Sequence, residues 1–322
     1  MNDKHSVSVN NEVVAGEMFY PATPKKRRKP INKEAVAGTL FASIPLVGFL
    51  IFGLIPLAIA FAMAFLKIRD FSITDAEYVG FQNFKDVLSD PEFGKSILNT
   101  VVLGSSTLIS QVLALLIAYL LSKEINGRKV FRIIYFIPYV CSAVAVVLMW
   151  QYIFNPNYGI LNQMLGRTGD DSINWFNNPD LFATMIIFIS VWSGMGYPII
   201  LYTAALTNIN RSTVEAATID GAGAFRVFWN VILPGISPTS FYLLVTGIIG
   251  ALQSFTTSNV LAPDGGPSGK GITIVFYLYR KIFNYVGQMG LASASSWILS
   301  LLILGVTIIN FVGSKKWVSY DQ

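Results

Sequence analysis

Hydrophobic residues dominate six long stretches of the chain, and the charged residues are gathered between them. None of these stretches contains Asp, Glu, Lys, Arg or His, and each exceeds the roughly 20 apolar residues that a helix needs to cross a bilayer. A chain in lipid must satisfy its backbone hydrogen bonds internally, and the stretches are too long and uniformly apolar for barrel strands. We predict an all-α integral membrane protein with six transmembrane helices, within residues 35–66, 96–122, 133–166, 181–210, 227–263 and 282–314.

Composition supports this class. Of the 322 residues, 53% are hydrophobic and 13% are charged, whereas a soluble domain carries about 25% charged residues. This excludes a soluble enzyme, a nucleic-acid-binding module and a disordered protein. The net charge of +5 is therefore interpreted first through membrane topology.

Basic residues indicate the orientation. Fifteen lie in the N-terminal tail, in the loops at 122–132 and 207–235, and at the C-terminus, whereas the other side has eight. Because basic loops stay inside, both termini are predicted to be cytoplasmic. Residues 1–34 form a basic tail, expected to be largely disordered, and residues 35–322 form the transmembrane domain. The basic run at 25–29 is interpreted as a lipid-touching anchor rather than a nucleic-acid patch.

Candidate chemistry inside the membrane is sparse. A single cysteine, Cys141, and a single histidine, His5 in the tail, exclude an internal disulfide and a Cys/His zinc site. We expect no metal site and no catalytic residue. A membrane-embedded enzyme would need ionisable residues clustered at one depth, and the spans hold none.

The chain also shows no energy source of its own. The spans lack the ionisable residues that ion-coupled carriers use. The glycine-rich run 264–271 lacks the first glycine and the Ser or Thr of a phosphate-binding loop, and 221–226 lacks the third glycine of a dinucleotide fingerprint. Two alternatives remain: a channel or secondary carrier for a neutral solute that works without ATP, or a subunit that a partner powers.

The cytoplasmic loop at 207–235 carries the sharpest signal. Ser212 and Glu215 have the spacing of a capping box, and Gly221 suits the left-handed residue that ends a helix. We predict a short helix at 212–221, followed by an amphipathic stretch before Pro234. Local physics alone leaves open whether this is a self-contained loop or a docking element for another protein.

The loop resembles the EAA signature of ABC-importer permeases, through Glu215-Ala216-Ala217, Asp220-Gly221 and the later Pro234. Two departures are Asn210, where the family has proline, and Asp264. Nearly the whole chain from residue 40 resembles the carbohydrate-importing (maltose, glycerol-phosphate and oligosaccharide) branch. The segments that carry this are 79–93, Asn99-Thr100, 137–140, Trp150, 154–165, Trp192, 265–267, Thr273, Tyr279, Phe283 and Gly287.

This resemblance implies a type I ABC-importer permease fold in the bacterial cytoplasmic membrane. It implies four kinds of partner: a homologous second permease, two ATPase subunits, an extracytoplasmic solute-binding protein and a sugar or oligosaccharide. The chain is then not an enzyme and holds no cofactor, because the ATPases bind ATP and magnesium. Glu215, Ala216, Ala217, Asp220 and Gly221 would form the coupling helix.

Sugar contacts are expected from the two spans that flank this loop. On one span, Gly247, Gly250, Ala251 and Ser254 share a face of small residues beside Gln253, which suits a cavity or equally tight helix packing. On the other, aromatic and hydroxyl side chains flank Gly194 and Gly196, although Trp192 could equally be a packing residue. The candidate substrate residues are Trp192, Ser193, Tyr197, Gly250, Gln253 and Ser254.

Overall fold

The computed structural model of the chain describes residues 33–69, 72–123, 127–285 and 288–319. The chain divides into two compact units, Met1–Ile55 and Pro56–Gln322, and each is described by itself. The predicted basic tail lies outside the described residues, apart from Lys33 and Glu34, with which the first helix begins.

The described part of the first unit is helical. It contains α1 (Lys33–Phe49) and the π-helical turn η1 (Leu50–Leu54). The apolar residues Ala37–Met63, which run on through α2 (Ile55–Met63), are long enough to cross a membrane, and none of the most apolar 18 is buried within the chain. Such a surface suits lipid or another protein rather than water.

After α2, the second unit contains an exception to the all-helical prediction. Strands β1 (Leu66–Arg69) and β2 (Ser72–Tyr78) form an antiparallel hairpin, in which Lys67 lies opposite Glu77. This segment falls between two charge-free stretches, and the cross-strand pair of opposite charges favours the hairpin. Asn83, on α3 (Gln82–Ser89), fastens the hairpin by donating hydrogen bonds to the carbonyls of Ala64 and Leu66.

The long helix α4 (Pro91–Ser122) organises the second unit. Asp90 caps it by accepting a hydrogen bond from the Glu92 amide at 2.8 Å, and Pro91 occupies the first turn, where no amide hydrogen is needed. The helix packs against α8 (Phe182–Gly194), α9 (Gly196–Asn208), α13 (Ser237–Leu252) and α15 (Ile274–Phe283).

The remaining helices are α5 (Arg128–Val140), α6 (Ala143–Ile153), α7 (Ile160–Met164), η2 (Gly169–Asp171), α10 (Arg211–Ile219), α11 (Ala224–Val227), η3 (Phe228–Ile232), α12 (Leu233–Gly235), α14 (Thr256–Leu261), η4 (Pro267–Gly269) and α16 (Met289–Ser314).

Two of the predicted spans are broken. Within the described residues, four helices are long and apolar enough to cross a membrane, or up to six if each bent pair counts as one span. Helices α5 and α6 meet at 101°, because Cys141 and Ser142 adopt extended backbone between them. Helices α8 and α9 meet at 44° around Met195, so Pro198 falls in the first turn of α9, where proline is tolerated.

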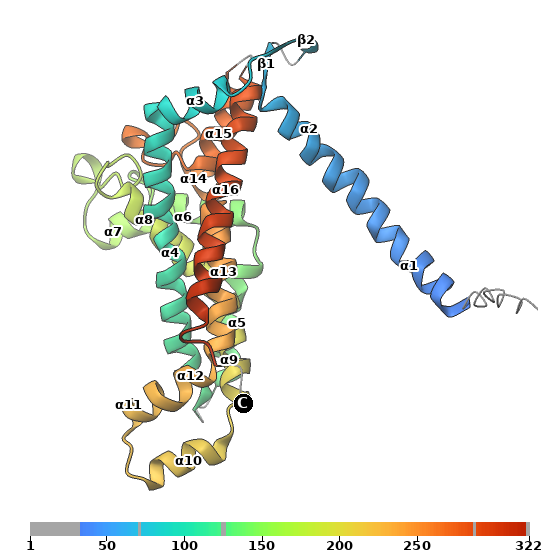
Figure 1. Cartoon of the computed structure of the whole chain (residues 1–322). Helices are drawn as coiled ribbons and strands as arrows, with labels where there is room; N and C mark the ends of the chain where they lie inside the picture. Colours follow the sequence, from blue (N-terminus) through green and yellow to red (C-terminus); the bar gives the residue numbers. More distant parts are fainter. Residues whose placement is uncertain (1–32, 70–71, 124–126, 286–287, 320–322) are drawn as a thin grey trace, which may run out of the picture. The chain divides into compact units, whose positions relative to one another are not determined.

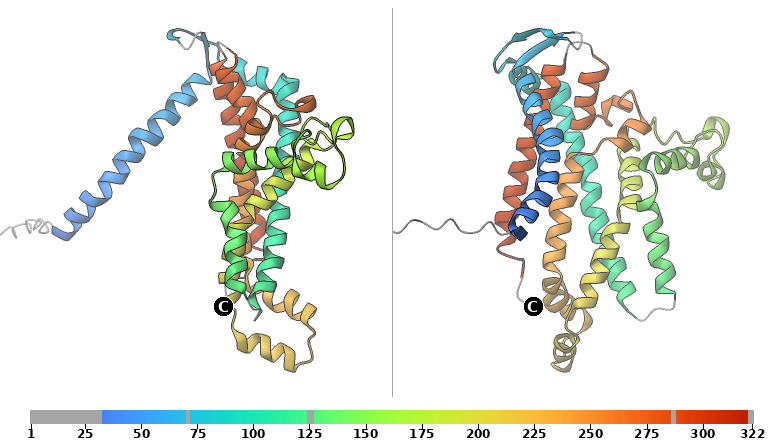
Figure 2. Two further views of the ribbon diagram at one scale, coloured as in Figure 1. Left: turned by 180° about the vertical axis from the view of Figure 1, so that it is seen from behind. Right: turned by 90° about the vertical axis from the view of Figure 1, so that its right-hand side faces the viewer.

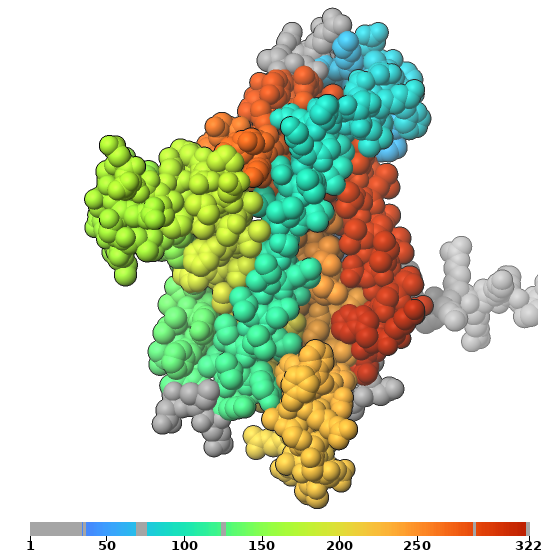
Figure 3. All heavy atoms as spheres, turned by 90° about the vertical axis from the view of Figure 1, so that its left-hand side faces the viewer, coloured from blue at the N-terminus to red at the C-terminus, as the bar shows by residue number. Residues whose placement is uncertain are grey.

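The second unit has two distinct ends (Figures 1 and 2). The hairpin and α3 lie at one, which we call the hairpin end, and α10 and α11 project at the other, which we call the loop end. The space-filling view shows a further projection formed by residues 154–181, which we call the side lobe (Figure 3). Asn162, 2% exposed, anchors this lobe by bonding the backbone of Ile173 and the indole of Trp175.

Candidate functional site

A cavity of about 450 Å³ lies between α4, α8, α9, α13 and α14. Its walls carry hydroxyl and amide groups beside the aromatic rings of Tyr139, Tyr197 and Phe255, and no charged side chain is among its lining residues in the described part of the chain. Hydroxyls and side-chain amides both donate and accept hydrogen bonds. The polar lining residues are Ser106, Thr107, Ser110, Gln111, Ser190, Thr246, Ser254, Thr257 and Ser258.

Some small residues of α13 allow close helix packing, and others leave open space in the cavity. A Cβ at Gly247 would collide with the amide nitrogen of Gln111 and lie 2.6 Å from the methyl of Thr107, so this glycine lets α13 approach α4 closely. Gly104 of α4 plays the same part for Ala251 of α13, because a Cβ at Gly104 would lie 3.1 Å from the Cβ of Ala251. Nothing lies within 4 Å of a Cβ built at Gly250, which therefore faces open space.

Two buried hydroxyls of the lining have no hydrogen-bond partner among the described residues, namely Ser110 Oγ and Ser254 Oγ. Ser110 is only 4% exposed. Buried polar groups are normally paired, because an unpaired one costs about 1–3 kcal/mol. Both hydroxyls belong to residues that line the cavity, so each is a candidate partner for a bound ligand.

The sequence analysis did not identify α4 as a wall of the cavity. Thr107, Ser110 and Gln111 are spaced i, i+3, i+4 and so share one face of this long helix. That polar stripe was the available signal, since polar side chains facing lipid are costly. Gln111 also donates a 2.7 Å hydrogen bond to the Leu243 carbonyl of α13 and thereby fixes one wall.

Aromatic rings form part of another wall. The rings of Tyr139 and Tyr197 stack with centroids 5.5 Å apart, and the Tyr197 hydroxyl lies 3.2 Å from that of Tyr242. Gly196 permits this arrangement, because a Cβ there would lie 2.6 Å from the Tyr135 carbonyl of α5.

The structure brings only part of the predicted substrate set to the cavity. Tyr197, Gly250 and Ser254 line it, whereas Trp192, Ser193 and Gln253 do not. The Trp192 indole packs edge-on against Trp150 at 5.3 Å, and the Ser193 hydroxyl donates to the Ile189 carbonyl of its own helix. Gln253 is exposed at the end of α13.

At the loop end, α10 begins differently from the predicted capping box. Asn210, rather than Ser212, caps the helix, and its Oδ1 accepts from the Ser212 amide at 3.0 Å and hydroxyl at 2.8 Å. Asparagine is among the strongest capping residues, and so it takes the role that the spacing assigned to Ser212. The helix ends as predicted: Gly221 is left-handed with φ +80°, and the Ala222 amide bonds the Ala217 carbonyl.

The loop end presents its side chains outward. Glu215, Ala216, Asp220 and Gly221 are exposed, and Ala217 is half-buried. Ile219 is 85% exposed, and Phe225 and Trp229 are also exposed large apolar residues. Phe228 instead packs against Tyr119 of α4 with ring centroids 5.1 Å apart, which joins this loop to the body of the second unit.

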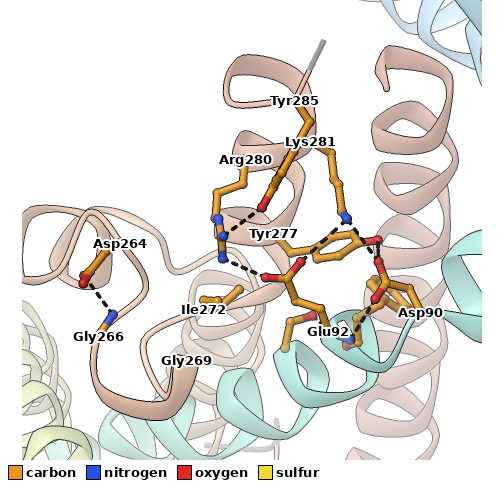
Figure 4. A network of polar contacts seen from close by, with 12 residues as sticks. Asp90, Glu92, Asp264, Gly266, Gly269, Ile272, Tyr277, Arg280, Lys281 and Tyr285 are labelled. Atoms are coloured by element: carbon orange, nitrogen blue, oxygen red, sulfur yellow. Dashed lines mark hydrogen bonds and ion pairs between the residues drawn. The ribbon is translucent and has the colours of Figure 1, made fainter. Parts of the chain in front are cut away.

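At the hairpin end, four charged residues and two tyrosines form a network between α4 and α15 (Figure 4). Arg280 pairs with Glu92 at 2.7 Å, Lys281 approaches Asp90 at 3.1 Å, and the Tyr277 hydroxyl donates to Asp90 at 2.7 Å. Tyr285 accepts a hydrogen bond from Arg280 at 3.1 Å. We call this network the clamp.

Burial raises the pKa of the Asp90 carboxyl, but the hydrogen bonds from Tyr277, the Glu92 amide and Lys281 outweigh it, and the pKa lies below its ordinary value. Burial and the neighbouring Asp90 raise the pKa of the Tyr277 hydroxyl above its ordinary value. The clamp therefore holds an ionised carboxylate and a neutral phenol at neutral pH.

The loop at 263–273 is fastened to α4 by residues that carried the family resemblance. The Asn99 side chain donates to the carbonyls of Gly269 and Ile272 at 2.8 and 3.0 Å, and Thr100 accepts from the Ile274 amide. The Thr273 hydroxyl caps α15 and donates to the Ser254 carbonyl at 2.7 Å. The loop thus connects directly to the cavity wall.

Comparisons with known proteins agree with this architecture. Residues 91–315 match the family described as binding-protein-dependent transport system inner membrane component. The chain is 33% identical over 308 residues to a probable ABC transporter permease protein, YesP, of Bacillus subtilis, covering 94% of this chain and 97% of YesP. It is 31% identical over 274 residues to the arabinooligosaccharides transport system permease protein AraP of the same organism, covering 84% and 86%.

A solved structure has the same fold. A chain of the bacterial alginate ABC transporter, in complex with an alginate pentasaccharide-bound periplasmic protein, matches with a TM-score of 0.72 and 25% identity, covering 86% of this chain and 92% of that one. With the matched family, the near full-length relatives and this shared fold, the chain belongs to the binding-protein-dependent inner membrane components, the permease subunits of ABC importers.

Proposed function

We propose that this permease subunit translocates a neutral sugar or oligosaccharide across the bacterial cytoplasmic membrane by ATP-driven alternating access. The observation that carries this proposal is the cavity, whose lining combines hydroxyls, amides and aromatic rings without a charged side chain among the described residues. Such groups complement the hydroxyls and apolar faces of sugar rings. The arabinooligosaccharide relative supports the same class.

The lack of charge distinguishes this cavity from one suited to anions. Some relatives are named as sn-glycerol-3-phosphate permeases, and the solved neighbour belongs to an importer of alginate, an acidic polysaccharide. A buried anion is costly unless it is paired with positive charge, and the described lining residues supply hydrogen-bonding groups but no positive charge. The cavity of this chain therefore fits an uncharged ligand better.

The working assembly contains a second permease, two ATPase subunits that hold ATP and magnesium, and an extracytoplasmic solute-binding protein. The loop end faces the cytoplasm with both termini, and an ATPase cleft receives α10 through Glu215, Ala216, Ala217, Asp220 and Gly221. The exposed Ile219 and the left-handed Gly221 support a docking surface, because both lie on a projection that buries no residue of α10.

The test is uptake by proteoliposomes that contain the complete importer with its binding protein. We expect ATP-dependent uptake from a panel of neutral oligosaccharides, arabinotriose and maltotriose among them, and none of trigalacturonate. Uptake of the trisaccharides by this chain alone, without ATPase or nucleotide, would instead identify a channel or secondary carrier. Uptake of trigalacturonate alone would overturn the neutral-sugar assignment.

A further inference from the structure

A second pocket lies apart from the cavity, on the side lobe. It has a volume of about 430 Å³, within the range of about 300–1,000 Å³ that is usual for ligand pockets. It is formed where the end of α6 meets the segments around 155–158 and 174–177. None of its lining residues is shared with the cavity.

The lining has an unusual combination of side chains. Tyr152 and Tyr158 place their rings 5.3 Å apart at 47°, and they are 65% and 53% exposed. Three asparagines, Asn155, Asn174 and Asn177, contribute amide groups beside the rings. No charged residue is among the lining residues of the described chain.

Internal hydrogen bonds preorganise the walls of this pocket. The Asn155 side-chain oxygen accepts from the amides of Asn157 and Tyr158, at 2.9 and 3.3 Å, and so fixes the turn that carries Tyr158. The Asn174 side-chain oxygen accepts from the Asn177 amide at 3.2 Å. Because these bonds use the oxygens, the NH₂ groups of Asn155 and Asn174 remain available as donors to a ligand.

The pocket is also tied to the cavity through α14. The Gln151 side chain, which lines the pocket, donates to the carbonyls of Val260 and Leu261 at 3.3 and 3.4 Å. One turn earlier on α14, Thr257 and Ser258 line the cavity. The short helix α14 therefore contacts the lining of both spaces.

The geometry points to an outer sugar-binding site in this pocket, which holds a neutral oligosaccharide before it enters the cavity. Exposed tyrosine faces stack on sugar rings, and fixed amide donors bind ring hydroxyls, without any charge to favour an acidic sugar. This inference rests on the proposed transport of a neutral sugar. It adds a binding step outside the translocation cavity, on the side lobe, whose backbone lies apart from α10 (Figure 2).

The experiment is photo-crosslinking on the assembled importer in nanodiscs, in the presence and absence of its binding protein. The probes are maltotriose and arabinotriose, each carrying a diazirine, with excess untagged sugar as competitor. Labelled peptides are mapped by mass spectrometry. We expect competed labelling within 151–158 or 174–177, in addition to labelling of the cavity segments 190–198 and 246–258.

Variants make the result specific. Asn177→Ala removes one hydrogen-bonding group and should weaken labelling of the pocket roughly 2- to 10-fold, with Tyr158→Ala at least as damaging. Met164→Ala alters an exposed side chain of the same lobe outside the pocket and should leave labelling unchanged. Cavity labelling should persist in all three, which shows that the protein is folded.

Labelled cavity segments with an unlabelled pocket would overturn this inference and leave the proposed function intact. No competed labelling at either place would overturn both. If the pocket is labelled only when the binding protein is present, and Tyr158→Ala weakens binding of that protein instead of the sugar, the surface is a protein contact and the sugar site is rejected.

Discussion

At the residue scale, the unpaired hydroxyl of Ser110 is a candidate sugar contact. It lies in the cavity wall, buried and without a partner among the described residues. If it bonds the sugar, Ser110→Ala should raise the KM for uptake roughly 2- to 10-fold, the value of one neutral hydrogen bond. The measurement is initial uptake rate against sugar concentration in proteoliposomes.

Ser105→Ala is the matched control, since its hydroxyl bonds the Val102 carbonyl and the residue does not line the cavity. An equal change in both variants would mean that the effect comes from α4 itself rather than from sugar contact.

Two glycines on α13 have different roles: one allows close helix packing and the other leaves space in the cavity. Gly247→Ala should destabilise the fold by about 1–3 kcal/mol, because the new methyl overpacks the contact with Gln111 and Thr107. Gly250→Ala meets no atom within 4 Å and should not destabilise the fold, since alanine favours a helix more than glycine does, but it should narrow the cavity and slow uptake. Thermal unfolding and uptake, measured on both variants, test this contrast; equal unfolding temperatures would contradict it.

At the element scale, the clamp joins the start of α4 to α15. Tyr277→Phe deletes a hydrogen bond to an ionised carboxylate and should cost about 1.5–3 kcal/mol. The unfolding temperature of the purified chain measures this loss. Tyr279→Phe, on the same helix but outside the clamp, is the control and should be neutral.

The clamp also predicts a pH dependence. The pKa of Asp90 is lower in the folded chain than its ordinary value, so the unfolded chain binds the proton more readily. The stabilisation is therefore complete above the ordinary carboxyl pKa of about 3.9 and declines as pH falls through the lower, folded value. Unfolding temperatures between pH 7 and pH 3 should fall more steeply for the native chain than for Asp90→Asn.

The proposed docking of α10 to an ATPase subunit gives a third prediction at this scale. Glu215→Lys reverses an exposed charge and should weaken ATPase association and uptake, while membrane insertion stays normal. Glu215→Gln preserves the shape and should have a smaller effect. Co-purification of the ATPase subunits measures association; undiminished co-purification with Glu215→Lys would argue against docking through this residue.

The elements that sequence analysis located are those with strong local signals. Gly221 ends α10 because only its backbone favours φ +80°. The kink at Cys141 and Ser142 was not predicted: Pro138 shortly before it marks a possible disturbance of the helix, but a proline does not reveal a turn of 101°. Trp192 illustrates a further limit: composition cannot distinguish an aromatic residue that faces a cavity from one that packs against Trp150.

At the scale of the whole molecule, the remaining question is orientation. With Cys141→Ser as background, we expect Ser212→Cys to react with a membrane-impermeant maleimide only from the cytoplasmic side, and Asp264→Cys only from outside. These positions lie at the loop end and on the 263–273 loop. Labelling is compared between intact cells and inverted vesicles. The reverse pattern would contradict the orientation predicted from the basic residues.

The bond from Thr273 to the Ser254 carbonyl has a mechanical consequence. Because the same threonine starts α15, a displacement of the 263–273 loop must either move the cavity wall at Ser254 or break this hydrogen bond. A protein that binds the 263–273 loop would therefore be coupled to the cavity through one hydroxyl group, without a rearrangement of the long helices.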